Sequence, residues 1–170
     1  VRTALLVTRG FSDLPVIGDQ QRPDLFSLRI DRPSPLYEIV VEVDERLDAS
    51  GRVVRPLDRA AVRAAIDELR RAGIASVAVA LMHAWVEPAH EVEVETMLRD
   101  AGIASVSRSS ALAPMIGIVE RGETAIVDAY LAPIIEQYLD RVSASASALQ
   151  VMTSAGGLVR RGNYRACDSL

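Results

Sequence analysis

The sequence contains no lysine and only one cysteine. Its 19 basic residues are all arginine, and 23 acidic residues give a formal net charge of −4. Without lysine, Schiff-base chemistry, lysine nucleophiles and a P-loop lysine are excluded. The lone Cys167 excludes a disulfide framework and a zinc–cysteine cluster within the chain. The net acidity gives no electrostatic reason to bind nucleic acid or an anionic membrane.

Long apolar runs and a leader segment are also missing. No run reaches the roughly 20 residues of a membrane span, and the chain opens on Val1 without a charged-then-apolar leader. Aromatic residues make up only 4% of the 170 residues, but 49% are apolar, which is enough for the core of one domain. We expect a cytoplasmic protein. Because the sequence begins inside a strand-like run, we also expect a piece of a longer one.

The hydrophobic pattern alternates between strand and helix periods, which predicts an α/β fold with a mainly parallel sheet, flanking helices and a β-hairpin. Pro133 is expected to kink or interrupt the last helix. The expected strands are 3–8, 75–82, 103–107 and 149–152, the hairpin spans 38–55, and the helices span 59–72, 88–101 and 119–142.

A nine-residue motif occurs twice, as LRRAGIASV at 69–77 and as LRDAGIASV at 98–106, an offset of 29 residues. That offset suits one strand plus one helix. The motif therefore predicts a helix–glycine–strand joint used twice. Short helical crossovers return strands in the same direction, so the joint also favours parallel pairing.

The two histidines lie in the segment HAWVEPAHE, directly after the longest apolar strand. Ligands of open α/β sheets gather at the carboxyl ends of strands, so His83 is a candidate substrate-binding residue. His83 and His90 could bind a metal together with Glu87 and Glu91. Seven residues separate the two imidazoles, however, unlike the i, i+4 pair of a helical zinc site. We favour a packing or capping role and predict no metal site.

Three further residues are candidates for substrate binding. Arg22 and Asp24 lie in a proline-broken stretch, where a polar loop could contact a substrate or where the two could simply pair with each other. Arg121 lies near the start of the long helix and could face an anionic ligand. The acidic residues around it suit the helix dipole, which is the structural alternative.

A glycine-rich turn follows the last expected strand. Ser154, Gly156 and Gly157 could cradle a phosphate, because glycines expose backbone N–H groups at close range. A purely structural turn is the alternative reading of the same residues.

Five segments in order resemble one protein family. They are RGFSDLPVIGDQQRPDLF, VDERLDASGRVVRPLD, VALMHAWVEPAHE, ERGETAIVDAYLAPIIEQYL and TSAGG. Together they resemble the N-terminal region of the A-type subunit in the hydantoinase A/5-oxoprolinase family, which includes acetone carboxylase subunits. The resemblance covers nearly the whole chain. The chain departs from the family's more usual residues at Thr153 and Ala155, where the family has Gln and Asn, and at Asp128, where it has Asn.

The resemblance implies an actin/sugar-kinase-like ATPase architecture, with residues 1–115 as the N-terminal-type α/β domain and 116–170 as the start of a truncated nucleotide-binding lobe. It implies an enzyme that uses ATP and Mg²⁺ to open a cyclic amide, a hydantoin or 5-oxoproline, through a phosphorylated intermediate. The carboxylase branch acts on a ketone instead. The implied partner is a B-type subunit or fused domain.

The acidic glycine-rich phosphate motifs that the resemblance implies do not occur in these 170 residues. We therefore expect the chain alone to bind no cofactor and to be inactive, and we expect its exposed apolar surface to favour a homodimer. Two other functions stay open. The chain could be a non-catalytic module that contacts the B-type subunit through residues 11–36 and the hairpin. It could also be a degenerate relative that binds another small molecule.

Overall fold

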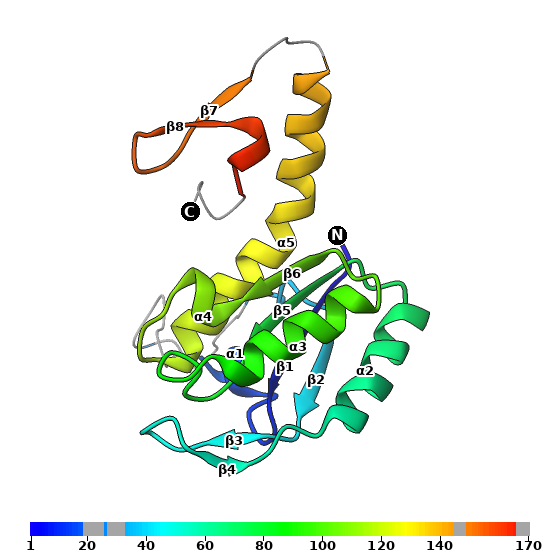
Figure 1. The fold of residues 1–170 in the computed structure, drawn as a ribbon, viewed down its shortest axis with the longest axis vertical. Coiled ribbons are helices and arrows are strands. Elements are labelled where there is room, and N and C mark those ends of the chain that lie inside the picture. The colour runs from blue at the N-terminus through cyan, green and yellow to red at the C-terminus, as the bar shows by residue number, and fades with distance from the viewer. Residues whose placement is uncertain (19–25, 27–32, 145–148, 166–170) are drawn as a thin grey trace.

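The computed structural model describes residues 1–18, 26, 33–144 and 149–165. Its centre is a four-stranded parallel sheet with the order β2-β1-β5-β6 (Figure 1). The α/β class with a mainly parallel sheet, predicted from the sequence, is confirmed. The strands of this sheet are β1 (Thr3–Thr8), β2 (Ile39–Val43), β5 (Ser76–Ala80) and β6 (Ser105–Arg108).

Helices cover both faces of the sheet (Figure 1). On one face, α2 (Arg59–Arg71) and α3 (Ala89–Asp100) bury a core with Leu6, whereas α5 (Ile118–Ser143) buries a core with Leu5 on the other. The short helices α1 (Leu14–Ile17) and α4 (Ser109–Leu112) pack against α5. Every residue of β1 and β5 is buried, as expected for strands covered on both faces.

The repeated motif occupies matching positions in two neighbouring strands. Ser76 of β5 pairs with Ser105 of β6, so the 29-residue offset in the sequence is also the register of the two strands. Their hydroxyl oxygens lie 2.9 Å apart. Gly73 and Gly102 end the preceding helices with φ of +70° and +90°, which glycine adopts without strain.

A proline inside α5 leaves one carbonyl without its helical donor. Pro133 has no N–H, so the carbonyl of Ala129 receives no bond from it. The Ser76 hydroxyl donates to this carbonyl instead, at 2.6 Å and in a buried position. The helix continues through Pro133 without the interruption that the sequence analysis considered. Neither α5 nor any other helix in the described ranges is long and apolar enough to cross a membrane.

Two expected strands pair differently from the prediction. Residues 149–152 do not join the parallel sheet, because β7 (Gln150–Met152) pairs antiparallel with β8 (Leu158–Arg160), and the short 3₁₀ helix η1 (Arg161–Asn163) follows. The expected hairpin at 38–55 is divided. Its first arm is β2 of the parallel sheet, and the hairpin itself joins β3 (Arg46–Leu47) to β4 (Val53–Arg55). Short apolar runs look alike whichever strand they pair with, so the local pattern did not give the partner.

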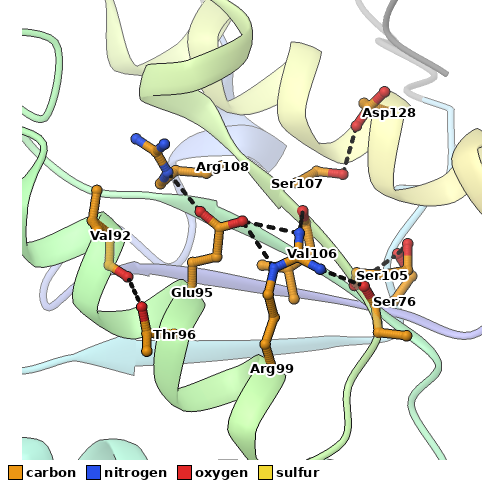
Figure 2. A network of polar contacts seen from close by, with 11 residues as sticks. Ser76, Val92, Glu95, Thr96, Arg99, Ser105, Val106, Ser107, Arg108 and Asp128 are labelled. Atoms are coloured by element: carbon orange, nitrogen blue, oxygen red, sulfur yellow. Dashed lines mark hydrogen bonds and ion pairs between the residues drawn. The ribbon is translucent and has the colours of Figure 1, made fainter. Parts of the chain in front are cut away.

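Asp128 on α5 connects this helix to β6. The Ser107 hydroxyl donates to Asp128 Oδ2 at 2.7 Å, as Figure 2 shows, whereas Oδ1 is buried and has no hydrogen-bond partner in the structure as described. Burial raises the pKa of Asp128 above its ordinary value of 3.8, and the bond from Ser107 opposes the rise only in part.

We expect Asp128→Asn to remove one pH dependence of stability. The folded carboxyl holds its proton more tightly than the unfolded one, so the parent chain loses stability as pH rises from 3.8 through the raised pKa. Asparagine carries no charge and escapes this loss. Urea unfolding should show that the free energy of unfolding of the variant, relative to that of the parent, rises by roughly 1–3 kcal/mol from about pH 4 to about pH 7. If variant and parent differed by the same free energy of unfolding at both pH values, the raised pKa of Asp128 would be contradicted.

Candidate functional site

The order of the strands places a topological switch point at the neighbouring strands β1 and β5. After β1 the chain runs to β2 on one side, and after β5 it runs to β6 on the other side. Open α/β sheets bind ligands at such a switch point, outside the carboxyl ends of the strands. In this chain polar residues directly follow β1, β2 and β6, and His83 comes three residues after the end of β5.

The first polar cluster joins the ends of β1, β2 and β5. The Thr8 hydroxyl donates to Glu45 Oε1 and accepts a bond of 2.8 Å from the N–H of Met82. The second carboxylate oxygen of Glu45 lies 2.7 Å from His90 Nδ1. Glu45 is fully buried and His90 is 8% exposed. Because the partner of Nδ1 is a carboxylate, we assign the proton to Nδ1, which leaves Nε2 as an acceptor.

The second polar cluster is centred on Glu91 in the first turn of α3. Its Oε1 accepts from the Leu81 N–H at 2.8 Å and from the Ser109 hydroxyl at 2.6 Å. Its Oε2 accepts from the Ser110 N–H at 2.9 Å. Glu91 has no exposed surface, so all of its charge is compensated by these donors and by the nearby Arg121. The cluster fixes the ends of β5 and β6 relative to α3.

Arg121 completes this cluster from the first turns of α5. Its Nε donates to the Ser109 hydroxyl at 3.0 Å, and a terminal nitrogen donates to the Leu81 carbonyl. Burial lowers the pKa of Arg121, and the negative charge of Glu91 opposes that shift. Arg121 is only 1% exposed, so in this structure its bonds are internal.

His83 lies where β5 leaves the sheet, beside the switch point. It is the one residue other than glycine with a positive φ in the described part of the chain, at +58°. Its carbonyl accepts from the Val86 N–H at 2.9 Å, which holds the loop in this conformation. Backbone strain of this kind is found at functional sites more often than elsewhere. The half-buried imidazole makes no hydrogen bond to any described residue, so it is available to a ligand.

The structure brings some of the predicted site residues together and separates others. His83 and Arg121 both lie at the carboxyl edge of the sheet. Ser154, Gly156 and Gly157 lie in the exposed turn between β7 and β8, far from that edge (Figure 1). Arg22 and Asp24 fall outside the described residues. Their roles toward substrate or nucleotide stay predictions.

Sequence reasoning missed Thr8 and Glu45. Glu45 is 37 positions from Thr8 and 45 from His90, so no local spacing links them. The only available signal was the acidic pair Asp44–Glu45 directly after an apolar run, the place where a parallel strand ends. Among the described residues, no three His, Cys, Asp or Glu side chains converge as metal ligands do.

A groove of about 850 Å³ lies along the outer edge of β6, between α3 and α5, and none of the predicted site residues lines it. Figure 2 shows how Glu95 holds two arginines at this edge. Arg99 donates to the carbonyls of Ala104 and Val106 at 2.8 and 3.4 Å. These carbonyls are therefore occupied, which protects the edge strand from pairing with another chain.

Two family models match the chain. The model of the hydantoinase/oxoprolinase N-terminal region matches residues 1–102, and the hydantoinase/oxoprolinase model matches residues 121–167. The chain belongs to the hydantoinase/oxoprolinase family, and the resemblance read from its five ordered segments is confirmed.

Named relatives add what these proteins do. 5-Oxoprolinase 1 of Arabidopsis thaliana is 45% identical over 157 residues, which are 81% of this chain and 12% of that protein. The acetophenone carboxylase gamma subunit of Aromatoleum aromaticum is 36% identical over 76% of this chain and 20% of its own. The crystal structure of an ATP-dependent caprolactamase from Pseudomonas jessenii superposes with a TM-score of 0.84 at 28% identity, covering 100% of this chain and 26% of that one. This chain therefore spans only a minor part of each relative.

We expect Glu91→Gln to destabilise the chain strongly. The amide group would place N–H donors against the N–H of Leu81 or Ser110, and Arg121 would lose its compensating charge. A cost of about 3 kcal/mol in the free energy of unfolding follows. Glu123→Gln on the exposed side of α5 is the matched control and should change stability by less than about 0.5 kcal/mol. Equal urea midpoints for the two variants would contradict the role given to Glu91.

Proposed function

We propose that this chain is part of an ATP-dependent enzyme that opens a cyclic amide, a hydantoin or 5-oxoproline, through a phosphorylated intermediate. The observation that carries the proposal is the match along the whole chain to an ATP-dependent caprolactamase, together with the 5-oxoprolinase relative. Both names describe the opening of a ring amide. We also propose that residues 1–115 form one domain and that 116–170 begin the next lobe.

The proposed substrate-binding residues are His83, which would touch the substrate directly, and Arg121, which would act through the backbone that it supports. His83 presents an imidazole at the switch point, where an amide carbonyl or N–H could meet it. Arg121 fixes the Leu81 carbonyl and thereby the start of the loop that carries His83. Arg22 and Asp24 remain proposed contacts from the segment after α1.

The proposed site for ATP and Mg²⁺ is complete only in the intact protein. In the turn between β7 and β8, the N–H groups of Gly156 and Gly157 already bond to Thr153, at 2.9 and 3.1 Å. Ser154, Gly156 and Gly157 remain the proposed phosphate contacts of the intact protein, in which the remaining ligands lie outside this chain. Bound nucleotide would supply a phosphoryl group that activates the amide oxygen.

We expect the 170-residue chain to release no ADP from ATP above a protein-free blank. The intact protein with its B-type subunit should release ADP faster when a hydantoin, 5-oxoproline or caprolactam is added. Turnover by the chain alone would contradict its inactivity. Stimulation by a ketone with bicarbonate, and by no cyclic amide, would establish the second candidate, a carboxylase-type subunit, which the acetophenone carboxylase relative favours.

The hairpin β3–β4 supports the proposed contact with a B-type subunit. Val53 and Val54 are 55% and 64% exposed, and Trp85 and Val86 of the loop after β5 are also exposed. A Cβ atom at Gly51 would lie 3.1 Å from Val86, so the hairpin and the loop 83–88 form one continuous surface. Apolar surface of this kind marks interaction sites. A homodimer through such surface remains a second proposal for the isolated chain.

We expect the double substitution Val53→Ser and Val54→Ser to weaken capture of the purified B-type subunit at least about tenfold, since buried apolar anchors dominate interfaces. Thermal stability should hardly change, because both side chains are exposed. Val92→Ser on α3, which is 42% exposed, is the matched control and should bind as the parent does. Unchanged capture by the double variant would show that the hairpin is not the contact surface.

A further inference from the structure

The Glu45–His90 pair differs from the other buried polar groups of the carboxyl edge in one respect. Both oxygens of Glu45 are occupied, by Thr8 and by His90 Nδ1. The other ring nitrogen, Nε2, makes no hydrogen bond with any described residue, and the His90 side chain keeps 10% of its surface exposed.

The support behind His90 is rigid. Thr8 receives the Met82 N–H at 2.8 Å, and its own hydroxyl proton goes to Glu45. Glu45 is 1% exposed and cannot rotate without losing both bonds. The imidazole is therefore held with its Nδ1–H on a fixed carboxylate, an arrangement that fixes the tautomer and stabilises the imidazolium when Nε2 takes a proton.

The position of His90 also suits chemistry. Thr8 ends β1, Glu45 follows β2 and His90 begins the helix after β5, so the three strands next to the switch point all contribute. His83 belongs to the same connection between β5 and α3. The two imidazoles therefore lie on one connection at the edge where open sheets of this kind bind their ligands.

The acidic groups near the ring belong to the segment after β2 and to α3. Glu45 holds Nδ1, and Glu91 is the next residue along the chain. The pKa of Glu93 is lowered first by its hydrogen bond from Arg59, and the charge of a protonated His90 lowers it further. The geometry alone, with Nδ1 on the carboxylate of Glu45, leaves Nε2 as the nitrogen that can exchange a proton with a ligand.

We propose that His90, oriented by Glu45 and Thr8, is the general base and acid that opens the ring of the cyclic amide, an inference that rests on the proposed function. Nε2 removes a proton from the water that adds to the carbon of the phosphorylated amide and passes that proton to the ring nitrogen. As the carbon–nitrogen bond breaks, Nε2 carries the proton of the added hydroxyl to the same nitrogen, which leaves as an NH2 group. The acyl phosphate that remains is hydrolysed by a second water to carboxylate and inorganic phosphate, and the imidazole ends as it began.

The test separates chemistry from structure with one matched variant, His90→Asn. The asparagine side-chain nitrogen can occupy the place of Nδ1 and keep the bond to Glu45, but nothing replaces Nε2. In the intact enzyme we expect an unchanged melting temperature, an unchanged KM for the cyclic amide, and a fall in kcat of about 100-fold or more, the usual contribution of a general base. Glu45→Gln should lower kcat less, through loss of the fixed tautomer.

A second measurement uses the 170-residue chain itself. Long-range ¹H–¹⁵N spectra of its two histidines should show Nδ1 of His90 protonated and Nε2 bare near neutral pH. Protonation of Nε2 instead, or a kcat of His90→Asn within about threefold of the parent, would overturn the proposal. If the parent enzyme opens no cyclic amide at all, the proposed function fails and the role of His90 fails with it. If the parent is active and His90→Asn is equally active, only the role of His90 fails.

Discussion

The carboxylate of Glu91 is the point on which the carboxyl edge of the sheet depends. It binds two backbone N–H groups, at the ends of β5 and β6, and the hydroxyl that in turn holds Arg121. A buried charge with fewer partners would destabilise the fold, so each of these bonds is required by the others. Strand ends that splay in other sheets are fixed here, and the loop with His83 starts from a fixed point.

The contact between sheet and long helix depends on two serines that the sequence repeats. Ser76 fills the gap that Pro133 opens in α5, and it lies beside Ser105 of the next strand. A helix with a proline would ordinarily bend or end, because one carbonyl is left exposed. Here a strand supplies the missing donor. The helix can therefore extend past the sheet and carry β7 and β8 away from it (Figure 1).

Local pattern was enough for most of the helices and strands, but not for their partners. The helices at 59–72 and 88–101 were predicted to within a residue or two of α2 and α3, because caps and apolar periods are local signals. The double motif predicted two equivalent helix–strand joints and parallel strands, and the structure adds that these two strands, β5 and β6, are neighbours. The partners of β2 and β7 depend on where distant segments lie, and so does the contact of Glu45 with Thr8 and His90. His83 and Arg121 could be proposed from the sequence because both follow recognisable strand or helix boundaries, and their roles toward a substrate stay predictions.

The two clusters at the carboxyl edge differ in how completely internal partners occupy their polar groups, and the proposed role of His90 depends on that difference. The charged groups of Glu91 and Arg121 are hydrogen-bonded to internal partners, so a ligand could bind them only by breaking bonds that hold the strands together. His83 and His90 each keep part of a ring available, one on a strained backbone and one on a fixed carboxylate. The two imidazoles are therefore the groups at this edge that a ligand could bind without breaking the internal bonds of Glu91 and Arg121.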